Sequence, residues 1–215
     1  MTNDLEIKSL NYFRNFVSNS EANNLLHQIE RSNRWTNLKH RRLQQHGGLP
    51  TPKGMIKELI QPWLSDLMEK VYNFVQKQTE VKALKVPNHV LINDYPKGAG
   101  IMAHKDGPLY TPVIMTVSLL SDSVIWLHKD SDPDRRFPVF LEKNSLVVFS
   151  DSFYTDYLHE IKDDQEEIID SDLFLNGDQH EFSGSISVEK DRRISITIRN
   201  VPNAKNNPLA RLKKR

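Results

Sequence analysis

The second half of the chain is a series of short β-rich runs with no helical pattern between them. From His89 onward these runs are separated by clusters of glycine, proline, aspartate and serine, and they occupy residues 89–95, 114–120, 123–128, 139–142, 145–150, 185–189 and 192–201. Many strands at this spacing, without helices between them, predict a β-sandwich or a jelly roll. The fold class expected from this pattern is therefore mainly β.

Two amphipathic helices are predicted before the strands. Ser18 and Glu21 have the spacing of a capping box, so a helix from about residue 19 to 31 is expected. A second helix begins at Pro62, a residue suited to the first helical turn, and apolar residues recur at helical intervals as far as Val75. Both are interpreted as helices that cover the sheets.

The chain has 215 residues and contains no internal repeat or dividing linker, so a single structural domain is expected. Residues 1–88 hold the cover helices and a basic segment. Residues 89–202 form the β-rich core, with an acidic insertion at about 160–182 that is expected to have weak structure of its own. Residues 203–215 form a basic tail with Arg211, Lys213, Lys214 and Arg215.

Cysteine is absent from the sequence, which excludes disulfides, zinc fingers, thiol nucleophiles and Cys-ligated iron–sulfur clusters. Any metal must therefore use nitrogen and oxygen ligands. No segment approaches the ~18 to 20 consecutive apolar residues of a membrane-spanning helix. We therefore expect no membrane contact, and a location in the cytoplasm and nucleus.

One histidine and aspartate pair has the spacing of metal ligands. His104 and Asp106 are two residues apart, so in an extended segment both side chains point to the same side and can reach one cation. His159, which follows the strand at 145–150, is placed to supply a third ligand from a returning strand. Two imidazoles and one carboxylate leave adjacent positions open on Fe(II). Taken alone, however, a His-x-Asp pair is more often two unliganded side chains.

The last strand carries two arginines on one face. Alternation from Arg193 to Arg199 places Ser195 and Thr197 with these arginines, and three isoleucines on the opposite face. The α-carbons of the two arginines lie roughly 20 Å apart at ~3.3 Å per residue, which suits an anion with charge at both ends. Guanidinium groups match carboxylates by paired hydrogen bonds. The alternative is an amphipathic edge strand whose polar face is solvated.

These features together resemble the AlkB-like Fe(II)/2-oxoglutarate dioxygenases. The resemblance rests on Asn93-Asp-Tyr95, the following PKGAG segment, His104-Lys-Asp106, the remote His159 and Arg193-x-Ser-x-Thr-x-Arg199. Longer segments at 41–55, 87–110 and 194–202 look like the sixth AlkB homologue of eukaryotes. The resemblance extends from about Trp35 to Pro202 and excludes the acidic insertion.

The resemblance implies a double-stranded β-helix, or jelly roll, behind N-terminal cover helices. It implies that His104, Asp106 and His159 are the catalytic iron ligands and that dioxygen and 2-oxoglutarate react at this metal. It also implies a cosubstrate site in which Arg193 pairs with the distal carboxylate and Arg199 lies near the end that chelates iron. The further cosubstrate contacts are Asn93, Tyr95, Thr197 and Ser195, although bacterial AlkB proteins typically carry asparagine at the position of Ser195.

The substrate prediction rests on a basic segment. No aspartate or glutamate occurs between Arg31 and Lys57, a region where AlkB-like enzymes carry a nucleotide-recognition lid. The candidate substrate contacts are Arg34, Trp35, Lys39, Arg41 and Arg42. Cations and an aromatic ring suit phosphates and bases, so single-stranded DNA or RNA is the expected partner and oxidative demethylation of alkylated nucleic acid the expected reaction. From charge alone, a solvated basic face is an equal alternative.

Two other functions stay open at this point. The same centre could act as a hydroxylase or demethylase of a protein or small molecule, or the chain could be a non-catalytic jelly roll that binds nucleic acid. Turnover of 2-oxoglutarate separates the last alternative from the enzymes. The acidic insertion could contact a basic protein partner, and nothing in the sequence indicates the oligomeric state.

Overall fold

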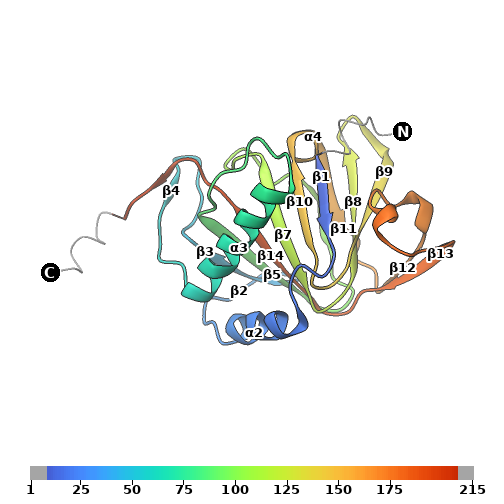
Figure 1. The fold of residues 1–215 in the computed structure, drawn as a ribbon, viewed down its shortest axis with the longest axis horizontal. Helices are drawn as coiled ribbons and strands as arrows, with labels where there is room; N and C mark the ends of the chain where they lie inside the picture. Colours follow the sequence, from blue (N-terminus) through green and yellow to red (C-terminus); the bar gives the residue numbers. More distant parts are fainter. Residues whose placement is uncertain (1–8, 208–215) are drawn as a thin grey trace.

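Two antiparallel sheets face each other in the computed structural model, which describes residues 9–207 (Figure 1). In spatial order, the major sheet contains β1 (Leu10–Phe13), β10 (Leu146–Ser150), β7 (Val113–Leu119), β14 (Arg193–Arg199), β5 (His89–Tyr95), β3 (Arg42–His46) and β2 (Thr36–Asn37). The minor sheet contains β6 (Ile101–His104), β11 (Tyr157–Ile161), β8 (Ser123–Lys129) and β9 (Asp132–Leu141). The basic cluster predicted near the C-terminus lies outside the described residues.

The chain passes back and forth between the two sheets as it winds. It enters β5 in the major sheet, crosses to β6 in the minor sheet, and returns to β7. Strands β8 and β9 form a hairpin in the minor sheet, after which β10, β11 and β14 again alternate between the sheets. This is the double-stranded β-helix expected from the sequence, and the fold class is confirmed.

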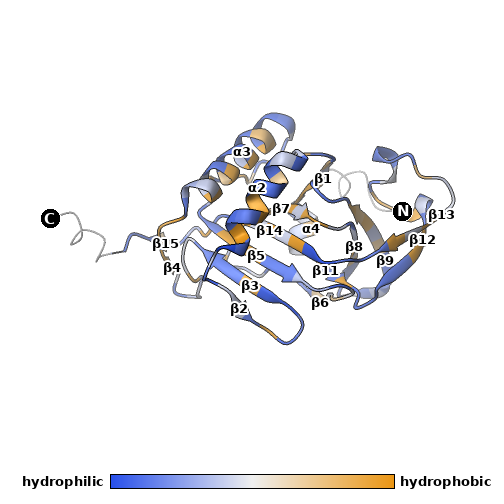
Figure 2. Cartoon of the chain, turned by 90° about the horizontal axis from the view of Figure 1, so that it is seen from below, coloured by the Kyte–Doolittle hydropathy of each residue, from blue (hydrophilic) through white to orange (hydrophobic). Residues whose placement is uncertain are grey.

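Helices α2 (Asn19–Glu30) and α3 (Pro62–Gln78) cover the outer face of the major sheet, and both show hydrophobic and hydrophilic residues side by side (Figure 2). The capping box predicted at Ser18 is present, with the side chains of Ser18 and Glu21 each accepting from the other residue's backbone N–H. The apolar faces of the helices pack against the isoleucines of β14 in one core. Within residues 9–207, no helix is long and apolar enough to cross a membrane.

The acidic insertion is folded, so the expectation that it has weak structure of its own is wrong. It contains β12 (Glu166–Asp170), which pairs as a hairpin with β13 (Ser185–Glu189), the predicted run directly after the insertion, beside β8 and β9 (Figure 1). Two 3-10 turns, η1 (Ser171–Leu173) and η2 (Gly177–Gln179), join these strands. Exposed and buried residues alternate along β12, so that Glu167 and Ile169 are buried, and Ile169 packs with Val188 against the minor sheet. These buried residues give the segment a hydrophobic core, which its high negative charge did not predict.

The N-terminal region does more than supply cover helices and a basic segment. Strand β3 pairs with β5 and extends the major sheet, while β1 pairs with β10 at its other edge. Strand β4 (Met55–Ile56) pairs in parallel with β15 (Ala204–Lys205), which joins the basic segment to the chain beyond β14. A short helix, α4 (Asp151–Thr155), connects β10 to β11. The residues predicted to bind metal and cosubstrate thus lie on paired strands or on the loop between β6 and β7.

Candidate functional site

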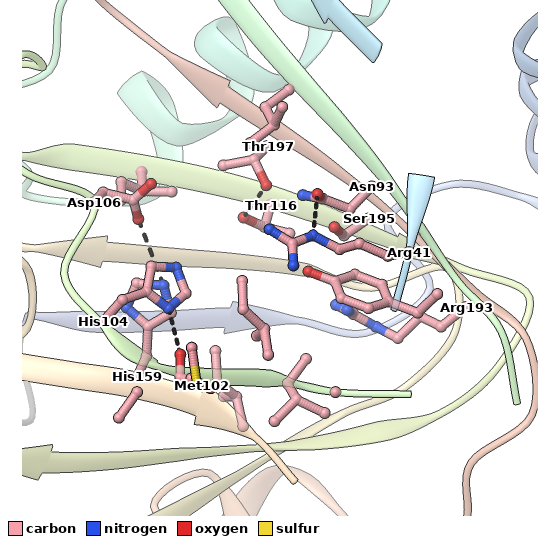
Figure 3. A pocket seen from close by; sticks show the side chains of 18 of the residues that line it. Arg41, Asn93, Met102, His104, Asp106, Thr116, His159, Arg193, Ser195 and Thr197 are labelled. Carbon is pink, nitrogen blue, oxygen red and sulfur yellow. Dashed lines mark hydrogen bonds and ion pairs between the residues drawn. The ribbon is translucent and has the colours of Figure 1, made fainter. Parts of the chain in front are cut away.

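A cavity of about 730 Å³ opens between the two sheets. Figure 3 shows His104, Asp106 and His159 gathered on one side of it, and Arg41, Asn93 and Arg193 on the other. All the residues predicted to bind the metal and the cosubstrate line this cavity: Asn93, Tyr95, His104, Asp106, His159, Arg193, Ser195, Thr197 and Arg199. The predicted metal site and the predicted cosubstrate site therefore lie in the same cavity.

The two histidines lie opposite each other on neighbouring strands. His159 of β11 is the antiparallel partner of His104 at the end of β6, and their ring centroids are 4.3 Å apart. Nδ1 of His104 lies 2.8 Å from the carbonyl oxygen of Met102. Because a carbonyl oxygen can only accept, Nδ1 is the donor, which leaves Nε2 as the nitrogen that could bind a metal. Burial lowers the pKa of His159 to about 4, so this imidazole is neutral at pH 7.

Asp106 reaches the same corner from the loop after β6. One oxygen, Oδ2, lies 3.6 Å from Nε2 of His159, and the other, Oδ1, lies 2.9 Å from Nη2 of Arg199. As they stand, no three histidine or carboxylate side chains in the described part of the chain form a group that could hold a metal ion. The carboxylate is drawn toward the guanidinium, which is the charged neighbour, so a metal site here would require Asp106 to turn toward the two imidazoles. The donor set itself fits Fe(II), since it offers two imidazole nitrogens and one carboxylate.

Arg193 is a buried cation without a carboxylate partner among residues 9–207. The residue is 5% exposed, its Nη2 donates to Oγ of Ser118 at 2.8 Å, and its Nε makes no hydrogen bond. Burial away from water lowers the pKa of the Arg193 guanidinium. A buried charge is costly unless it is paired, so this end of the cavity fits an anionic ligand. A dicarboxylate that extends toward His104 would supply the missing charge.

Arg41 lies with the residues predicted to bind the cosubstrate, although the sequence placed it among the substrate contacts. Its Nε donates to Oδ1 of Asn93 at 3.1 Å, and its guanidinium carbon lies 5.9 Å from the centre of the Tyr95 ring. Arg193 lies at the same distance, 5.9 Å, from the same ring. Two guanidinium groups therefore flank Tyr95, and the basic segment extends into the cavity.

The remaining predicted substrate contacts divide into two groups. Lys39 lines the cavity, whereas Arg34, Trp35 and Arg42 do not. Arg34 pairs with Glu58 at 3.3 Å, and the guanidinium carbon of Arg42 lies 4.1 Å from the centre of the Trp35 ring. The indole is thus covered by a neighbouring cation.

Sequence reasoning missed several residues of the cavity wall. His40 and Met102 line it, and Met102 is 85% exposed. The wall also contains the apolar side chains of Ile125, Leu141, Val147 and Phe149. Met102 was detectable in principle, because it lies two residues before His104 on the same strand and shares its face. No spacing rule marked the four apolar residues, since they come from three different strands.

A second hollow of about 740 Å³ adjoins the cavity. It lies between the β2–β3 hairpin and the turn at 96–99, and it shares Lys39, His40, Arg41 and Asp163 with the cavity. Its arginines Arg42 and Arg192 pair with Asp94, at 2.7 and 2.8 Å. Lys39 and Lys97 have no ion pair with any residue that the structure describes. The hollow is therefore a groove with uncompensated positive charge.

Sequence comparisons identify a matching family and similar proteins. The sequence pattern of the family described as "2OG-Fe(II) oxygenase superfamily" matches residues 48–199. The "Probable RNA/DNA demethylase ALKBH6" of Danio rerio is 34% identical over 204 residues, which cover 89% of this chain and 85% of the relative. The "Alpha-ketoglutarate-dependent dioxygenase alkB homolog 7, mitochondrial" of Mus musculus is 32% identical over 122 residues, or 56% of this chain and 48% of that protein.

Solved structures share the fold at low identity. The structure of OsALKBH1 gives a TM-score of 0.58 with 13% identity, over 89% of this chain and 98% of that one. A prolyl hydroxylase from Trichoplax adhaerens, in complex with a hypoxia inducible factor peptide fragment, gives a TM-score of 0.56 with 15% identity, over 92% and 85% of the two chains. At these identities the structures show a common architecture.

Proposed function

Since the chain belongs to the 2OG-Fe(II) oxygenase superfamily and, within it, to the AlkB homologues, we propose that it oxidatively demethylates alkylated DNA or RNA. As a member of this family it is a dioxygenase that uses Fe(II), 2-oxoglutarate and dioxygen. The observation that carries the proposal is a cavity and a groove that lie side by side and share lining residues. The cavity contains the histidine corner and the buried Arg193, and the groove that adjoins it and shares part of its wall is lined by the unpaired Lys39 and Lys97.

In the proposed metal site, His104, Asp106 and His159 hold Fe(II). Nδ1 of His104 donates to a backbone carbonyl, which leaves Nε2 as its metal-binding nitrogen, and His159 is kept uncharged by burial. Bound iron, together with 2-oxoglutarate and dioxygen, supplies the oxidation of a substrate C–H bond. The protein supports this chemistry with a wall of apolar side chains, which excludes water from the reacting groups.

In the proposed cosubstrate site, Arg193 pairs with the carboxylate of 2-oxoglutarate that is distant from the metal. Burial raises the pKa of Tyr95, so its hydroxyl stays protonated and can donate to a carboxylate. Asn93 lies next to it on the inner face, and Arg41 is hydrogen-bonded to Asn93. These donors orient the cosubstrate along the cavity toward His104.

In the proposed substrate site, Lys39 and Lys97 bind phosphates that flank the alkylated nucleotide. Lysine side chains without carboxylate partners suit phosphodiester oxygens, because binding does not require an existing ion pair to break. The alkylated base enters the cavity from this groove. Hydroxylation of an N-methyl group gives an N-hydroxymethyl group, which releases formaldehyde and leaves the N–H. The name of the Danio rerio relative, probable RNA/DNA demethylase, supports the same substrate class.

The metal and cosubstrate sites are tested by succinate release from purified, Fe(II)-loaded protein. His104→Ala, Asp106→Ala and Arg193→Ala are each expected to abolish or severely weaken 2-oxoglutarate turnover. His27→Ala, on the outer helix α2, is the matched control and is expected to behave as wild type. Unchanged succinate production in all three site variants would rule out the assignment.

The substrate class is tested by comparing methylated single-stranded oligonucleotides with candidate nuclear proteins. Oligonucleotides are expected to stimulate succinate and formaldehyde release, with binding that weakens steeply as salt increases. Lys39→Glu and Lys97→Glu are each expected to raise the KM for the oligonucleotide. Stimulation by a protein and by no oligonucleotide would instead assign a protein substrate.

A further inference from the structure

The loop that carries Asp106 is tied to the rest of the fold at several points. The hydroxyl of Tyr154 donates to the carbonyl oxygen of Gly107 and lies 3.3 Å from that of Tyr110. At the far end of the loop, the backbone N–H and Oγ1 of Thr111 donate to Asn200 at 2.9 and 2.7 Å. The hydroxyl of Tyr154 therefore contacts the backbone at both ends of the segment from Gly107 to Tyr110, directly after Asp106.

Tyr154 is itself held by a rigid element. It lies on α4, between β10 and β11, and its neighbour Phe153 is 2% exposed in the core between the sheets. The ring of Phe153 lies 4.8 Å from that of Tyr157. Asp151 begins this helix with a φ of +46°, a left-handed conformation that is uncommon for a residue other than glycine. The turn into α4 is thus specified, and it directs Tyr154 toward the loop.

A second route connects the same loop to the carboxylate. The guanidinium carbon of Arg199 lies 4.6 Å from the centre of the Tyr110 ring, and Nη2 of Arg199 lies 2.9 Å from Oδ1 of Asp106. The ring of His89, which is 1% exposed, lies 5.7 Å from the ring of Tyr110. Fixing the backbone at Tyr110 therefore also fixes the ring on which Arg199 lies.

We infer that Tyr154 is a positioning residue for the metal site, because its hydroxyl fixes the backbone on which Asp106 is presented to His104 and His159. The inference rests on the proposed role of Asp106 as a metal ligand. Gly107 has a φ of +87° and no atom within 4 Å of where a Cβ would lie, so packing alone does not hold this backbone. The hydrogen bond from Tyr154 supplies the restraint that packing leaves out.

The protonation of Tyr154 is compatible with this role. Burial, and then the negative charge of Asp106, raise the pKa of its hydroxyl to about 12. The group therefore stays a donor throughout the range in which the protein would be assayed. Phenylalanine at this position keeps the ring and removes only the donor.

The test measures metal affinity without activity. Mn(II) alone is titrated into the whole protein, and free Mn(II) is read from its electron paramagnetic resonance signal. Tyr154→Phe is expected to bind Mn(II) about 10-fold or more weakly than wild type, the size of effect typical for groups that orient metal ligands. Tyr72→Phe, on the partly exposed side of α3, is the matched control and is expected to bind as wild type.

The outcomes separate this inference from the proposed function. If wild type binds Mn(II), Asp106→Ala does not, and Tyr154→Phe keeps wild-type affinity, the positioning role is refuted while the metal site stands. If Asp106→Ala binds as wild type, the proposed ligand set is refuted. Should Tyr154→Phe fail to fold, Tyr154→Met removes the same hydrogen bond with a more flexible apolar side chain, and wild-type affinity in that folded variant would overturn the inference.

Discussion

Replacing Arg193 with methionine removes a buried guanidinium. This guanidinium donates a hydrogen bond to Ser118 but has no carboxylate partner among residues 9–207. Methionine is similar in length and carries no charge. In the absence of ligand, replacement of a buried charge by an apolar side chain is often neutral or stabilises by about 1–4 kcal/mol. We therefore expect the unliganded variant to unfold at the wild-type temperature or above it.

The liganded state is expected to change in the opposite direction. Removing one partner of a buried ion pair costs about 3–5 kcal/mol, which corresponds to about 100- to 4000-fold in the dissociation constant of 2-oxoglutarate. For wild type, ligand at 100 times its dissociation constant stabilises by about 2.7 kcal/mol, which raises Tm by about 5 to 11 °C in a chain of this size. Arg193→Met is expected to lose this increase almost completely.

The assay is thermal unfolding with Mn(II), with and without 2-oxoglutarate, supported by calorimetric titration. Arg192→Met is the matched control, because Arg192 is the adjacent residue but pairs with Asp94 and Glu30. It is expected to keep wild-type affinity for 2-oxoglutarate and to lose some stability. Wild-type affinity in Arg193→Met, or an unliganded variant that unfolds well below wild type, would refute the view that Arg193 is uncompensated without ligand.

Two further predictions concern stability. Glu167 and Lys190 form a buried pair 2.7 Å apart, so replacing either one with alanine is expected to cost about 3–5 kcal/mol in urea unfolding, while Glu167→Leu with Lys190→Met recovers most of it; wild-type stability in both single variants would contradict this. Burial, followed by the charge of Arg34, lowers the pKa of His46 from 6.5 to about 4. The unfolded chain binds this proton first, so the free energy of unfolding is expected to fall as pH drops from 6.5 toward 4, and less so in His46→Gln. Equal pH dependence in wild type and variant would exclude His46 as the cause.

Local patterns in the sequence predicted the elements whose faces repeat with a simple period. The alternation along β14 placed Arg193 and Arg199 on the cavity side and the isoleucines in the helix-covered core, as the structure has them. The capping box predicted the start of α2. His159 was predicted as the third ligand from its place after the strand at 145–150, and the family resemblance supported that prediction. Neither predicted that His159 is the direct strand partner of His104, since periodicity contains no information about long-range contacts.

The acidic insertion shows why composition can mislead. Its net negative charge indicated weak structure, yet Glu167 is 6% exposed and accepts from Nε1 of Trp126 at 2.7 Å. The charge of Glu167 is compensated by the nearby Lys162 at 3.4 Å and by the buried Lys190 at 2.7 Å, which lies far along the sequence. A residue's charge therefore predicts its exposure only when its partner is known.

The sequence by itself determined which face each strand presents, where the helices begin, and which side chains could bind a metal and a dicarboxylate. Each of these properties depends on neighbours within a few residues. Only the tertiary structure decided that Arg41 enters the cavity while the adjacent Arg42 pairs with Asp94, and that Tyr154 reaches the loop after Asp106. Those contacts depend on sheet register and on the path of connections between strands, which are set by the packing of the whole chain and not by any local pattern.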